Sequence, residues 1–432
     1  MKLLLIQAWN GKEASLRGKF SNLISYSSLT LAVICSLIPR DMFEKTDVVD
    51  EYSQRLDYDR DRYDLVMISS DTSSVLSAYK HSHAFQKRGA YTVIGGYHAT
   101  ALPDEVGKHC DTVISGPAEL ALPAFLKDFA AGCPKPFYRE ANVCAADMTI
   151  PDRSLITQRH KLRVPAVVAN RGCVNHCRYC SMAMMWRNDP RAIENVIAEI
   201  RSLHTKFLIF YDPNFFSDRA YAIKLMKALR PLRILWVCNA TADLGNDHEL
   251  MSLAYRSGCR GVLIGFESLN PSSLKSVAKR FSNADRYREI ISNIHSHGMA
   301  VNGCFVLGFD SDTEEELRAL PERIEKLGLD LCRFSVLTPY PGTPIFADYE
   351  RRGRITSHRW NLYDQHHVVF RPKNISARRL HRLYRQVWKE AYSWRRIFKR
   401  VLRSPVLFGP AGLFLLGANI GFRYLGIDEK CR

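Results

Sequence analysis

The sequence predicts an α/β protein with an N-terminal doubly wound parallel sheet (Rossmann-like), a partial (β/α)6 TIM-type barrel and a helical C-terminal region. Three observations support this prediction. Short apolar runs alternate with helical periodicity up to residue 132, six more apolar runs do so between residues 163 and 340, and helical periodicity dominates after residue 376. Alternating strands and helices are typical of parallel sheets covered by helices. At 432 residues, of which 46% are apolar, the chain has room for about two or three domains.

We expect residues 1–132 to form the first domain. Its strand candidates are the runs KLLLIQ, YDLVMISS, YTVIGGYHA and DTVISG, and helical patterns follow the first, second and fourth of them. Ligands of doubly wound sheets bind outside the carboxyl ends of the strands. The turn segments SSDTSS, GGYHAT and SGPAE fall at these ends, and Gly95 and Gly96 would let a backbone approach a ligand closely.

Residues 133–162 have the character of a linker, with proline, mixed charge and little periodicity. They include Cys133 and Cys144. Together with Cys35 and Cys110, these thiols either hold a second metal cluster or are four unrelated cysteines. We favour the second interpretation because no two of them have the spacing of metal ligands.

Residues 163–345 are expected to form the barrel. Its six strand candidates are VPAVVAN, KFLIFYD, RILWVCNA, GVLIGFES, VNGCFVLGF and LCRFSVLTP. Asp189 is expected to cap the helix that follows the first strand, with Pro190 at the first helical position. Active sites of such barrels lie at the carboxyl ends of the strands.

A cluster of three cysteines follows the first barrel strand, in the segment RGCVNHCRYC. The chain start MKLLLIQAWN is expected to be a strand rather than a signal peptide, which favours a cytoplasmic, reducing compartment. There, clustered thiols indicate metal binding or catalysis. Zinc is the less favoured alternative, because it would need a fourth ligand and His176, inside the loop, could reach it only awkwardly. Three thiolates suit an iron–sulfur cubane with one open iron.

The spacing C-x3-C-x-aromatic-C, with Tyr179 at the aromatic position, resembles the signature of the radical SAM (S-adenosylmethionine) superfamily. The resemblance implies that Cys173, Cys177 and Cys180 hold a [4Fe–4S] cluster whose open iron chelates SAM. It also implies reductive cleavage of SAM to a 5′-deoxyadenosyl radical, with an external electron donor such as flavodoxin or ferredoxin. Tyr179 would then lie near the adenine.

Further SAM-binding candidates follow from the same resemblance. They are Asp212 for the ammonium group, Gly265 and Glu267 for the ribose, and Gly308 for close approach to the adenine. Two alternatives stay open. Asp212 could cap a turn instead, and Glu267 could pair with Arg260 or Lys275.

The first domain resembles the cobalamin-binding domain that precedes many radical SAM barrels. The segment from Gly95 to Thr100, followed by Pro103, matches the pattern G-G-x-H-x-T/S-x-x-P, and residues 116–119 match G-x-x-E. The implied cobalamin-binding residues are Ser70, Thr72, Gly95, Gly96, His98, Gly116 and Glu119. The D-x-H-x-x-G motif that places a histidine on cobalt is absent, so we expect no histidine ligand and consider a hydrogen bond within the loop the alternative role of His98.

Residues 346–432 are expected to be a helical region that carries most of the net charge of +17. Segment 371–403 has twelve cations and one anion, a net +11, on a helix that Ser376 should cap. The uncharged segment 404–422 follows it. A basic helix beside an apolar segment favours peripheral membrane contact. The alternative is that 404–422 packs against the barrel.

Taken with the two resemblances, the sequence predicts an enzyme that methylates an unactivated carbon of a small-molecule or lipid-like substrate with the help of methylcobalamin. A non-methylating radical cyclisation, rearrangement or oxidation on the same scaffold is the alternative. A methylthiotransferase is less favoured because the C-terminal region is helical, and no nucleic-acid partner is expected.

Overall fold

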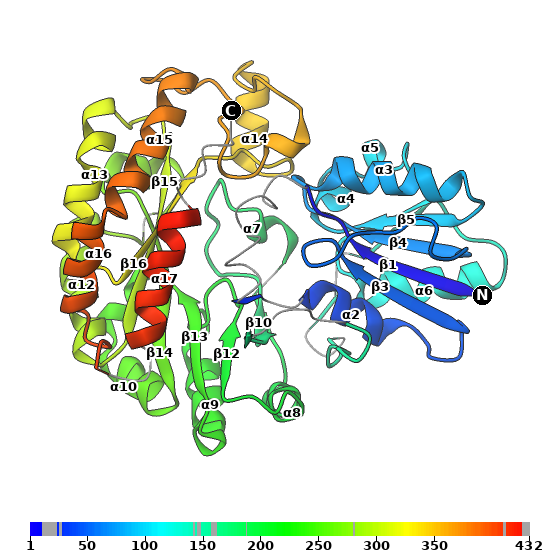
Figure 1. The fold of residues 1–432 in the computed structure, drawn as a ribbon, viewed down its shortest axis with the longest axis horizontal. Helices are drawn as coiled ribbons and strands as arrows, with labels where there is room; N and C mark the ends of the chain where they lie inside the picture. The colour runs from blue at the N-terminus through cyan, green and yellow to red at the C-terminus, as the bar shows by residue number, and fades with distance from the viewer. Residues whose placement is uncertain are drawn as a thin grey trace. The chain divides into compact units, whose positions relative to one another are not determined.

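The chain forms two compact units (Figure 1). The computed structural model describes residues 1–10, 24–25, 28–140, 143–144, 148–156, 162–186, 188–279, 281–408 and 412–425. Unit 1 comprises Met1–Val164, Tyr340–Thr343 and His358–Asp364, and unit 2 comprises Pro165–Pro339, Pro344–Ser357 and Gln365–Arg432. This division differs from the expected boundaries because two short segments after residue 339 pack with unit 1 and the rest of the C-terminal region packs with the barrel.

Unit 1 is a doubly wound parallel sheet, as predicted. Its strands are β1 (Lys2–Gln7), β3 (Lys45–Asp50), β4 (Leu65–Ser69), β5 (Tyr91–Gly95), β6 (Thr112–Ser115) and β7 (Phe137–Arg139), in the order β3-β1-β4-β5-β6-β7. The order reverses between β1 and β4, which is where such sheets bind ligands. β7 lies in the segment expected to be a linker, and it pairs in parallel with β6.

Helices cover both faces of this sheet. They are α2 (Leu29–Leu37), α3 (Val75–Gln86), α4 (Tyr97–Ala101), α5 (Pro103–Val106) and α6 (Ala118–Ala130). Alternate strand residues such as Leu3, Leu65 and Val93 pack with Leu31 of α2 and Phe125 of α6. The residues between them point to the opposite face, because side chains alternate along a strand.

Unit 2 contains the predicted six-stranded parallel sheet of the partial barrel. Its strands are β9 (Ala166–Val167), β12 (Phe207–Phe210), β13 (Leu235–Ala240), β14 (Cys259–Glu267), β15 (Ala300–Leu307) and β16 (Leu331–Val336), in the order β16-β15-β14-β13-β12-β9. Each overlaps one of the six apolar runs, and β14 and β15 begin one or two residues before theirs. The helices that follow strands are α8 (Ile193–Ser202), α9 (Arg219–Leu229), α10 (His248–Arg256), α11 (Pro271–Ser276), α12 (Tyr287–Ser296) and α13 (Glu314–Leu327).

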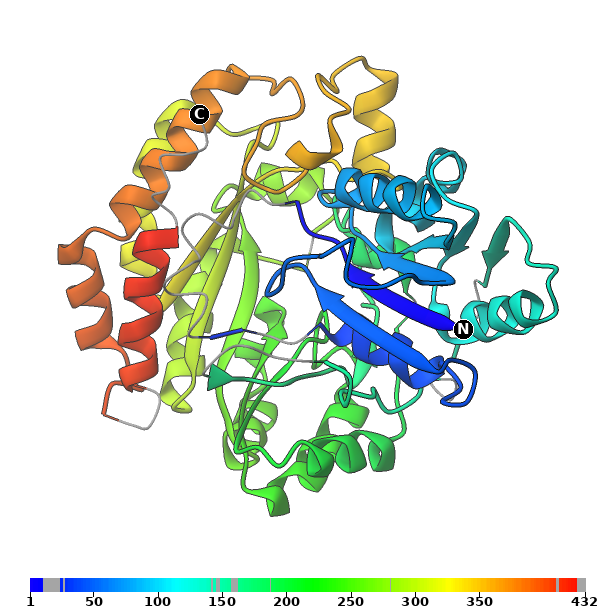
Figure 2. The same ribbon diagram turned by 45° about the vertical axis from the view of Figure 1, so that its right-hand side comes forward.

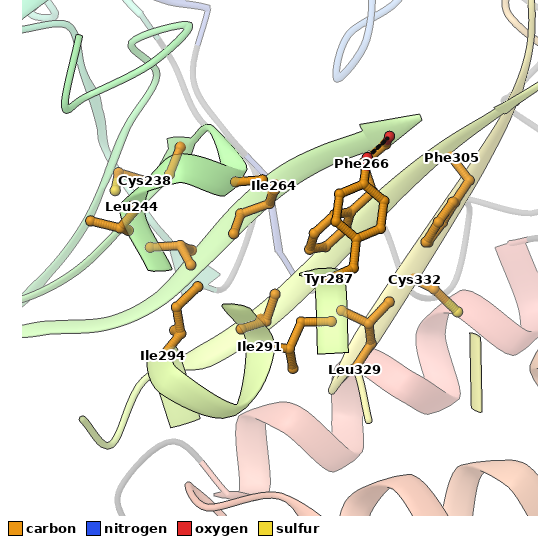
Figure 3. Packing of buried hydrophobic residues seen from close by; sticks show 14 of the residues in the cluster. Cys238, Leu244, Ile264, Phe266, Tyr287, Ile291, Ile294, Phe305, Leu329 and Cys332 are labelled. Atoms are coloured by element: carbon orange, nitrogen blue, oxygen red, sulfur yellow. Dashed lines mark hydrogen bonds between the residues drawn. The ribbon is translucent and has the colours of Figure 1, made fainter. Parts of the chain in front are cut away.

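The two faces of this sheet differ in burial. The outer face packs against helices: Figure 3 shows Phe266 of β14 and Phe305 of β15 beside Tyr287 and Ile291 of α12. The alternate residues form the inner face, and many of them are half-buried or exposed, including Val237 at 36% exposure. The inner face is therefore the side on which the barrel can receive a ligand.

The expectation that Asp189 caps a helix is wrong. Helix α8 begins at Ile193, and its N-cap residue is Ala192. Asp189 and Pro190 instead form strand β11, which pairs in antiparallel fashion with β10 (Asn170–Arg171). The chain is extended here because β11 is held beside the start of the cysteine segment, an interaction that local sequence does not reveal.

The C-terminal helices pack on the barrel. They are α14 (Pro344–Arg351), α15 (Ala377–Ala391), α16 (Trp394–Arg403) and α17 (Gly412–Leu425). As predicted, Ser376 caps α15, because its hydroxyl accepts the N–H of Arg379. Figures 1 and 2 show α17, in red, beside α16. The side-chain amide of Asn419 in α17 donates to the carbonyl of Asp330 next to β16. Much of segment 404–422 thus packs against the barrel, the alternative considered above.

Part of the basic segment is neutralised within unit 2. Arg379 pairs with Glu314, and both Arg396 and Lys399 pair with Glu325. Both carboxylates belong to α13, so these cations attach α15 and α16 to the barrel. None of the helices in the described ranges is long and apolar enough to cross a membrane.

Candidate functional site

The three signature cysteines lie on one loop that begins at the carboxyl end of β9. Cys177 is buried, while Cys173 and Cys180 are half-buried. Arg178 anchors the loop through its backbone: its N–H donates to the carbonyl of Val277 at 3.1 Å, and its carbonyl accepts the N–H of Ile345 at 3.1 Å. The loop is thus held between the end of α11 and the start of α14.

The electrostatics of the loop bear on metal binding. Burial raises the pKa of the Cys177 thiol to about 11, and the ammonium of Lys279 acts in the opposite direction. A thiolate at this position is therefore favoured by a positive neighbour such as a bound iron. Among the described residues, no three His, Cys, Asp or Glu side chains surround a point that a single metal ion could fill. A cluster of several irons spreads its ligands more widely, so this finding concerns single-ion sites.

A buried ion pair lies beside the cysteine loop. The Nζ atom of Lys279 is 2.8 Å from Oε1 of Glu267, and both side chains are buried. Burial raises the pKa of the Tyr179 hydroxyl, and the carboxylate of Glu267 adds to this effect. The short distance between Nζ and Oε1 identifies Lys279 as the partner of Glu267. Neither Arg260 nor Lys275, the two considered from sequence, takes this role.

Lys279 is a site residue that the sequence analysis did not identify. It stands twelve positions after Glu267, in the segment AKRF that follows α11. The two adjacent cations in this segment were the sequence feature that could have indicated a partner for Glu267. Arg260 is engaged elsewhere, because its guanidinium donates to the carbonyls of Tyr255 and Cys259.

Gly265 provides the space for this pair. A Cβ atom at Gly265 would collide with the Glu267 carboxylate and lie 3.0 Å from Nζ of Lys279. Glu267 itself has φ of 64°, in the left-handed region that costs energy for residues other than glycine. This strained residue lies at the register shift between β14 and β15. The backbone thus turns so that the carboxylate meets the ammonium.

Asp212 is placed to hold the start of the cysteine segment. Its fully buried carboxylate accepts the backbone N–H groups of Ala169, at 3.2 Å, and Asn170. Burial raises its pKa to about 7, and these hydrogen bonds act in the opposite direction. The observed role is thus a local structural one, as in the turn-capping alternative. Contact with the SAM ammonium group stays a prediction.

Gly308 has φ of 108°, and its environment explains why glycine is needed. A Cβ atom would lie 2.8 Å from Cδ2 of Leu380 and 3.3 Å from the ring of Phe370. The N–H of Gly308 donates to the carboxylate of Asp312 at 2.8 Å. Packing within unit 2 therefore accounts for this glycine, and close approach to adenine stays a prediction.

In unit 1, candidate residues gather at the carboxyl ends of β4, β5 and β6. The hydroxyls of Ser70 and Ser115 are buried and have no hydrogen-bond partner among the described residues. Unsatisfied buried hydroxyls are costly, so a polar ligand at this edge would satisfy them. Glu119 is buried in the first turn of α6. These residues fit a polar cofactor at the expected edge of the sheet.

Two glycines of this region are required by contacts of the chain with itself, and their approach to cobalamin stays a prediction. A Cβ atom at Gly96, where φ is 105°, would collide with the backbone of Ser70. At Gly116, a Cβ atom would lie 2.6 Å from the carbonyl oxygen of Glu140. A Cβ atom at Gly95 would meet only ordinary contacts with Ile114. Gly96 and Gly116 therefore allow the chain to approach itself, which sequence alone could not distinguish from approach to a ligand.

His98 is fully buried within unit 1. Its Nδ1 atom lies 3.2 Å from the hydroxyl of Thr72, and its Nε2 atom lies 3.6 Å from Glu105. Burial lowers the pKa of His98, against the opposing effect of Glu105. The carboxylate of Glu105 also accepts the indole N–H of Trp360 and the hydroxyl of Tyr79. The contact with Thr72 joins α4 to the turn after β4, so it resembles the hydrogen-bonding alternative for His98 but reaches beyond its own loop.

Comparison with known proteins decides the family. The radical SAM superfamily profile matches residues 167–344, which include the cysteine loop and strands β12 to β16 of the barrel. The chain is 30% identical over 392 residues to bacteriochlorophyllide d C-12(1)-methyltransferase of Chlorobaculum tepidum, covering 88% of this chain and 85% of that protein. The chain belongs to the radical SAM superfamily. This radical SAM enzyme therefore uses a [4Fe–4S] cluster and SAM.

Other relatives of this radical SAM enzyme cover most of both chains. Bacteriochlorophyllide d C-8(2)-methyltransferase of Chlorobaculum tepidum is 27% identical, over 87% of this chain and 88% of that protein. Among solved structures, TsrM of Kitasatospora setae, a radical SAM methyltransferase with cobalamin and a [4Fe–4S] cluster bound, has a TM-score of 0.67 at 16% identity. This match covers 81% of this chain and 78% of TsrM. Cobalamin-dependent OxsB has a TM-score of 0.62 at 12% identity, and the match covers 83% of this chain and 63% of OxsB. The likeness to these enzymes in fold thus extends over most of the chain.

Proposed function

We propose that this radical SAM enzyme is a cobalamin-dependent methyltransferase that adds a methyl group to an unactivated carbon of a small-molecule or lipid-like substrate. The observation that carries the proposal is the match to a C-methyltransferase over 88% of the chain at 30% identity, which spans both units. A barrel alone would account for SAM cleavage, but not for the sheet of unit 1 that precedes it.

The barrel residues would act as follows. Cys173, Cys177 and Cys180 would hold the cluster, and Glu267 would bind the SAM ribose from the end of β14. Lys279 would orient the Glu267 carboxylate through the ion pair at 2.8 Å. When bound, the cluster and SAM supply the one-electron chemistry that activates a C–H bond, and cobalamin supplies the methyl group. Tyr179, whose buried hydroxyl has a raised pKa, stays neutral and would help to exclude water from the adenine side.

The cobalamin site would lie at the carboxyl ends of β4 and β6. The buried hydroxyls of Ser70 and Ser115 support this position, because polar groups of a bound cofactor would give both of them hydrogen-bond partners. His98 would contribute through its contact with Thr72 and would not reach cobalt, because its imidazole is fully buried.

Product mass tests the proposal. Anoxically reconstituted protein with SAM, methylcobalamin, reductant and bacteriochlorophyllide d as the first substrate should yield a product heavier by one methylene unit. A product of unchanged mass, or one that has lost hydrogen, would favour the alternative rearrangement, cyclisation or oxidation. The absorption spectrum with and without cobalamin should show the cluster and the bound corrin separately.

We further propose that α16 contacts an anionic membrane surface. Trp394, Phe398 and Leu402 follow one another at four-residue spacing and are 43%, 57% and 71% exposed. Arg395 and Arg403 are exposed on the same helix. Exposed aromatic and aliphatic groups flanked by cations are typical of helices that lie at the lipid interface.

Co-sedimentation with vesicles that contain an anionic lipid tests this surface. The native protein should bind at low salt and release at high salt. Replacing both Phe398 and Leu402 by Ser should abolish binding, whereas Leu76→Ser, at an exposed position of α3, should not. If native protein fails to sediment with anionic vesicles at low salt, the membrane proposal is wrong and the exposed stripe has another partner.

A further inference from the structure

The charged side chains on the inner face of the barrel strands do not balance one another. Side chains on this face alternate with the buried outer residues along the strands. Within β9 and β12 to β16, all of which the structure describes, the inner face carries two charged residues, Glu267 and Arg333. Glu267 is neutralised by Lys279. Arg333 therefore contributes the one uncompensated charge of these strands on the ligand-facing side.

The position of Arg333 relates it to the site already described. Arg333 of β16 is in register with Cys304 of β15, and Cys304 is in register with Gly265 of β14. Gly265 borders the Glu267–Lys279 pair. Adjacent parallel strands lie about 4.8 Å apart, so Arg333 is roughly 10 Å across the sheet from Gly265. This distance is on the scale of one small ligand beside the candidate SAM site.

Among the residues that the structure describes, no carboxylate pairs with the guanidinium of Arg333. The side chain is exposed, and within the described residues it forms no ion pair. Its inner-face neighbour Cys304 is neutral, because burial raises the pKa of that thiol to about 12. A guanidinium presents paired N–H donors that match the two oxygens of a carboxylate. An unpaired one on a ligand-facing strand is thus available to an anion brought by the ligand.

Neutral polar side chains beside Arg333 suit the same ligand. The side-chain oxygen of Asn302 is buried and has no hydrogen-bond partner in the described part of the chain. Asn302 lies on the inner face of β15, two residues before Cys304. The oxygen and nitrogen of an asparagine amide exchange places by a flip, so this group can also donate. Ser335 lies on the inner face two residues after Arg333, and its hydroxyl donates to Gln365 at 3.4 Å.

We propose that Arg333 anchors a carboxylate-binding subsite on the inner face of the barrel, with Asn302 and Ser335 as neutral partners. The carboxylate belongs to the substrate, because Arg333 lies across the sheet from Gly265 at about the width of one small ligand. The subsite then selects substrates that carry a free acid, and this inference rests on the proposed function. A single guanidinium among neutral groups matches a singly charged carboxylate better than a phosphate dianion.

Arginine-selective labelling tests the subsite without requiring the substrate. Phenylglyoxal modification of Arg333 in the reconstituted full-length enzyme is followed by peptide mass spectrometry. The reagent is applied alone, with benzoate, with its neutral analogue benzamide, with SAM, and with decarboxylated SAM. We expect benzoate to slow labelling of Arg333 at least about five-fold, and benzamide to leave it unchanged. Exposed Arg382 of α15 provides the internal control, because its labelling should not respond.

The SAM arms identify the source of the carboxylate. Protection by SAM but not by decarboxylated SAM would show that Arg333 binds SAM itself and would overturn the substrate subsite. Equal behaviour of these two compounds, with protection by benzoate, assigns it to the substrate. The inference is also overturned if benzoate slows labelling of Arg333 no more than benzamide does. Failure of native enzyme to methylate any substrate would oppose the proposed function but would not alter the labelling result.

Variants supply a second measurement. Benzoate binding to the native enzyme is measured as a change in intrinsic fluorescence. This change should be absent in Arg333→Gln and partly retained in Arg333→Lys, because lysine keeps the positive charge. Both variants should keep the native melting temperature, since the side chain is exposed and forms no internal ion pair. Unchanged benzoate binding by Arg333→Gln would also contradict the proposal.

Discussion

The ammonium of Lys279 lies 2.8 Å from the carboxylate of Glu267, and both groups are buried beside the cysteine loop. A buried ion pair is stable only while both partners are present, because either charge alone is left without solvent. The strained backbone at Glu267 and the missing side chain at Gly265 both serve this contact. The pair therefore has a structural role and also sets the direction of a candidate SAM-binding carboxylate.

Removing Lys279 should destabilise unit 2. Lys279→Met leaves Glu267 as an unpaired buried charge, and we expect a loss of about 3–5 kcal/mol in the free energy of unfolding. The double variant Glu267→Gln, Lys279→Met should recover much of this loss. Urea denaturation measures both effects, and Lys275→Met on exposed α11 is the matched control. A single variant as stable as the native protein would show that the pair does not contribute to folding.

Adding a methyl group at Gly265 should weaken SAM binding more than it weakens folding. In Gly265→Ala the new Cβ displaces the ends of two flexible side chains, so the Glu267 carboxylate is redirected while the strand persists. We expect SAM affinity to fall about ten-fold, equivalent to about 1.4 kcal/mol. Equilibrium binding of SAM to the reconstituted enzyme measures this change. Gly417→Ala, which meets no neighbouring atom, should have no effect.

The buried carboxylate of Asp212 should make stability depend on pH. Its pKa of about 7 in the folded protein exceeds the value of about 4 for an unfolded chain. The folded state therefore binds the extra proton between these values, and stability should fall as pH rises from about 4 to about 7. Asp212→Asn removes this titration, so the variant should lose less stability over that interval. Parallel denaturation curves at pH 4.5 and 7.5 test this, and equal pH dependence would contradict it.

Truncating the same side chain should loosen the cysteine segment. Asp212→Ala leaves the buried N–H groups of Ala169 and Asn170 without acceptors, at a cost of about 1–3 kcal/mol for each group. Hydrogen exchange at these two amides should accelerate in Asp212→Ala and change less in Asp212→Asn. Unaltered exchange in the alanine variant would show that the carboxylate does not hold this backbone.

Each signature cysteine should be required for the cluster. Replacement of Cys173, Cys177 or Cys180 by Ala leaves one iron without a protein ligand, so iron content and production of 5′-deoxyadenosine should both be lost. Cys133→Ala, at an exposed thiol of unit 1, should retain both. Formation of 5′-deoxyadenosine by a triple alanine variant would oppose the assignment of these ligands.

Cobalamin should bind without a histidine on cobalt. The imidazole of His98 is fully buried, and its Nδ1 atom contacts Thr72. Electron paramagnetic resonance of the cob(II)alamin form should therefore lack axial nitrogen splitting, both in the native protein and in His98→Ala. A nitrogen triplet that disappears in the variant would show that His98 is the ligand.

The sequence by itself determined the element types and the family signature. Strands and helices follow from local periodicity, so the six barrel strands and the Ser376 cap were predictable from adjacent residues. The cysteine spacing is also local, because one loop carries all three thiols. These features depend little on what packs against them.

Only the tertiary structure decided the contacts between distant segments. It paired Glu267 with Lys279 in place of Arg260, and it made Asp189 part of a strand in place of a helix cap. It also showed that Gly96 leaves space for the backbone of Ser70. In each case the partner comes from a different element, and its distance depends on the packing of the whole unit. A buried charge or a missing Cβ indicates that a close neighbour exists, but only the folded chain determines which neighbour it is.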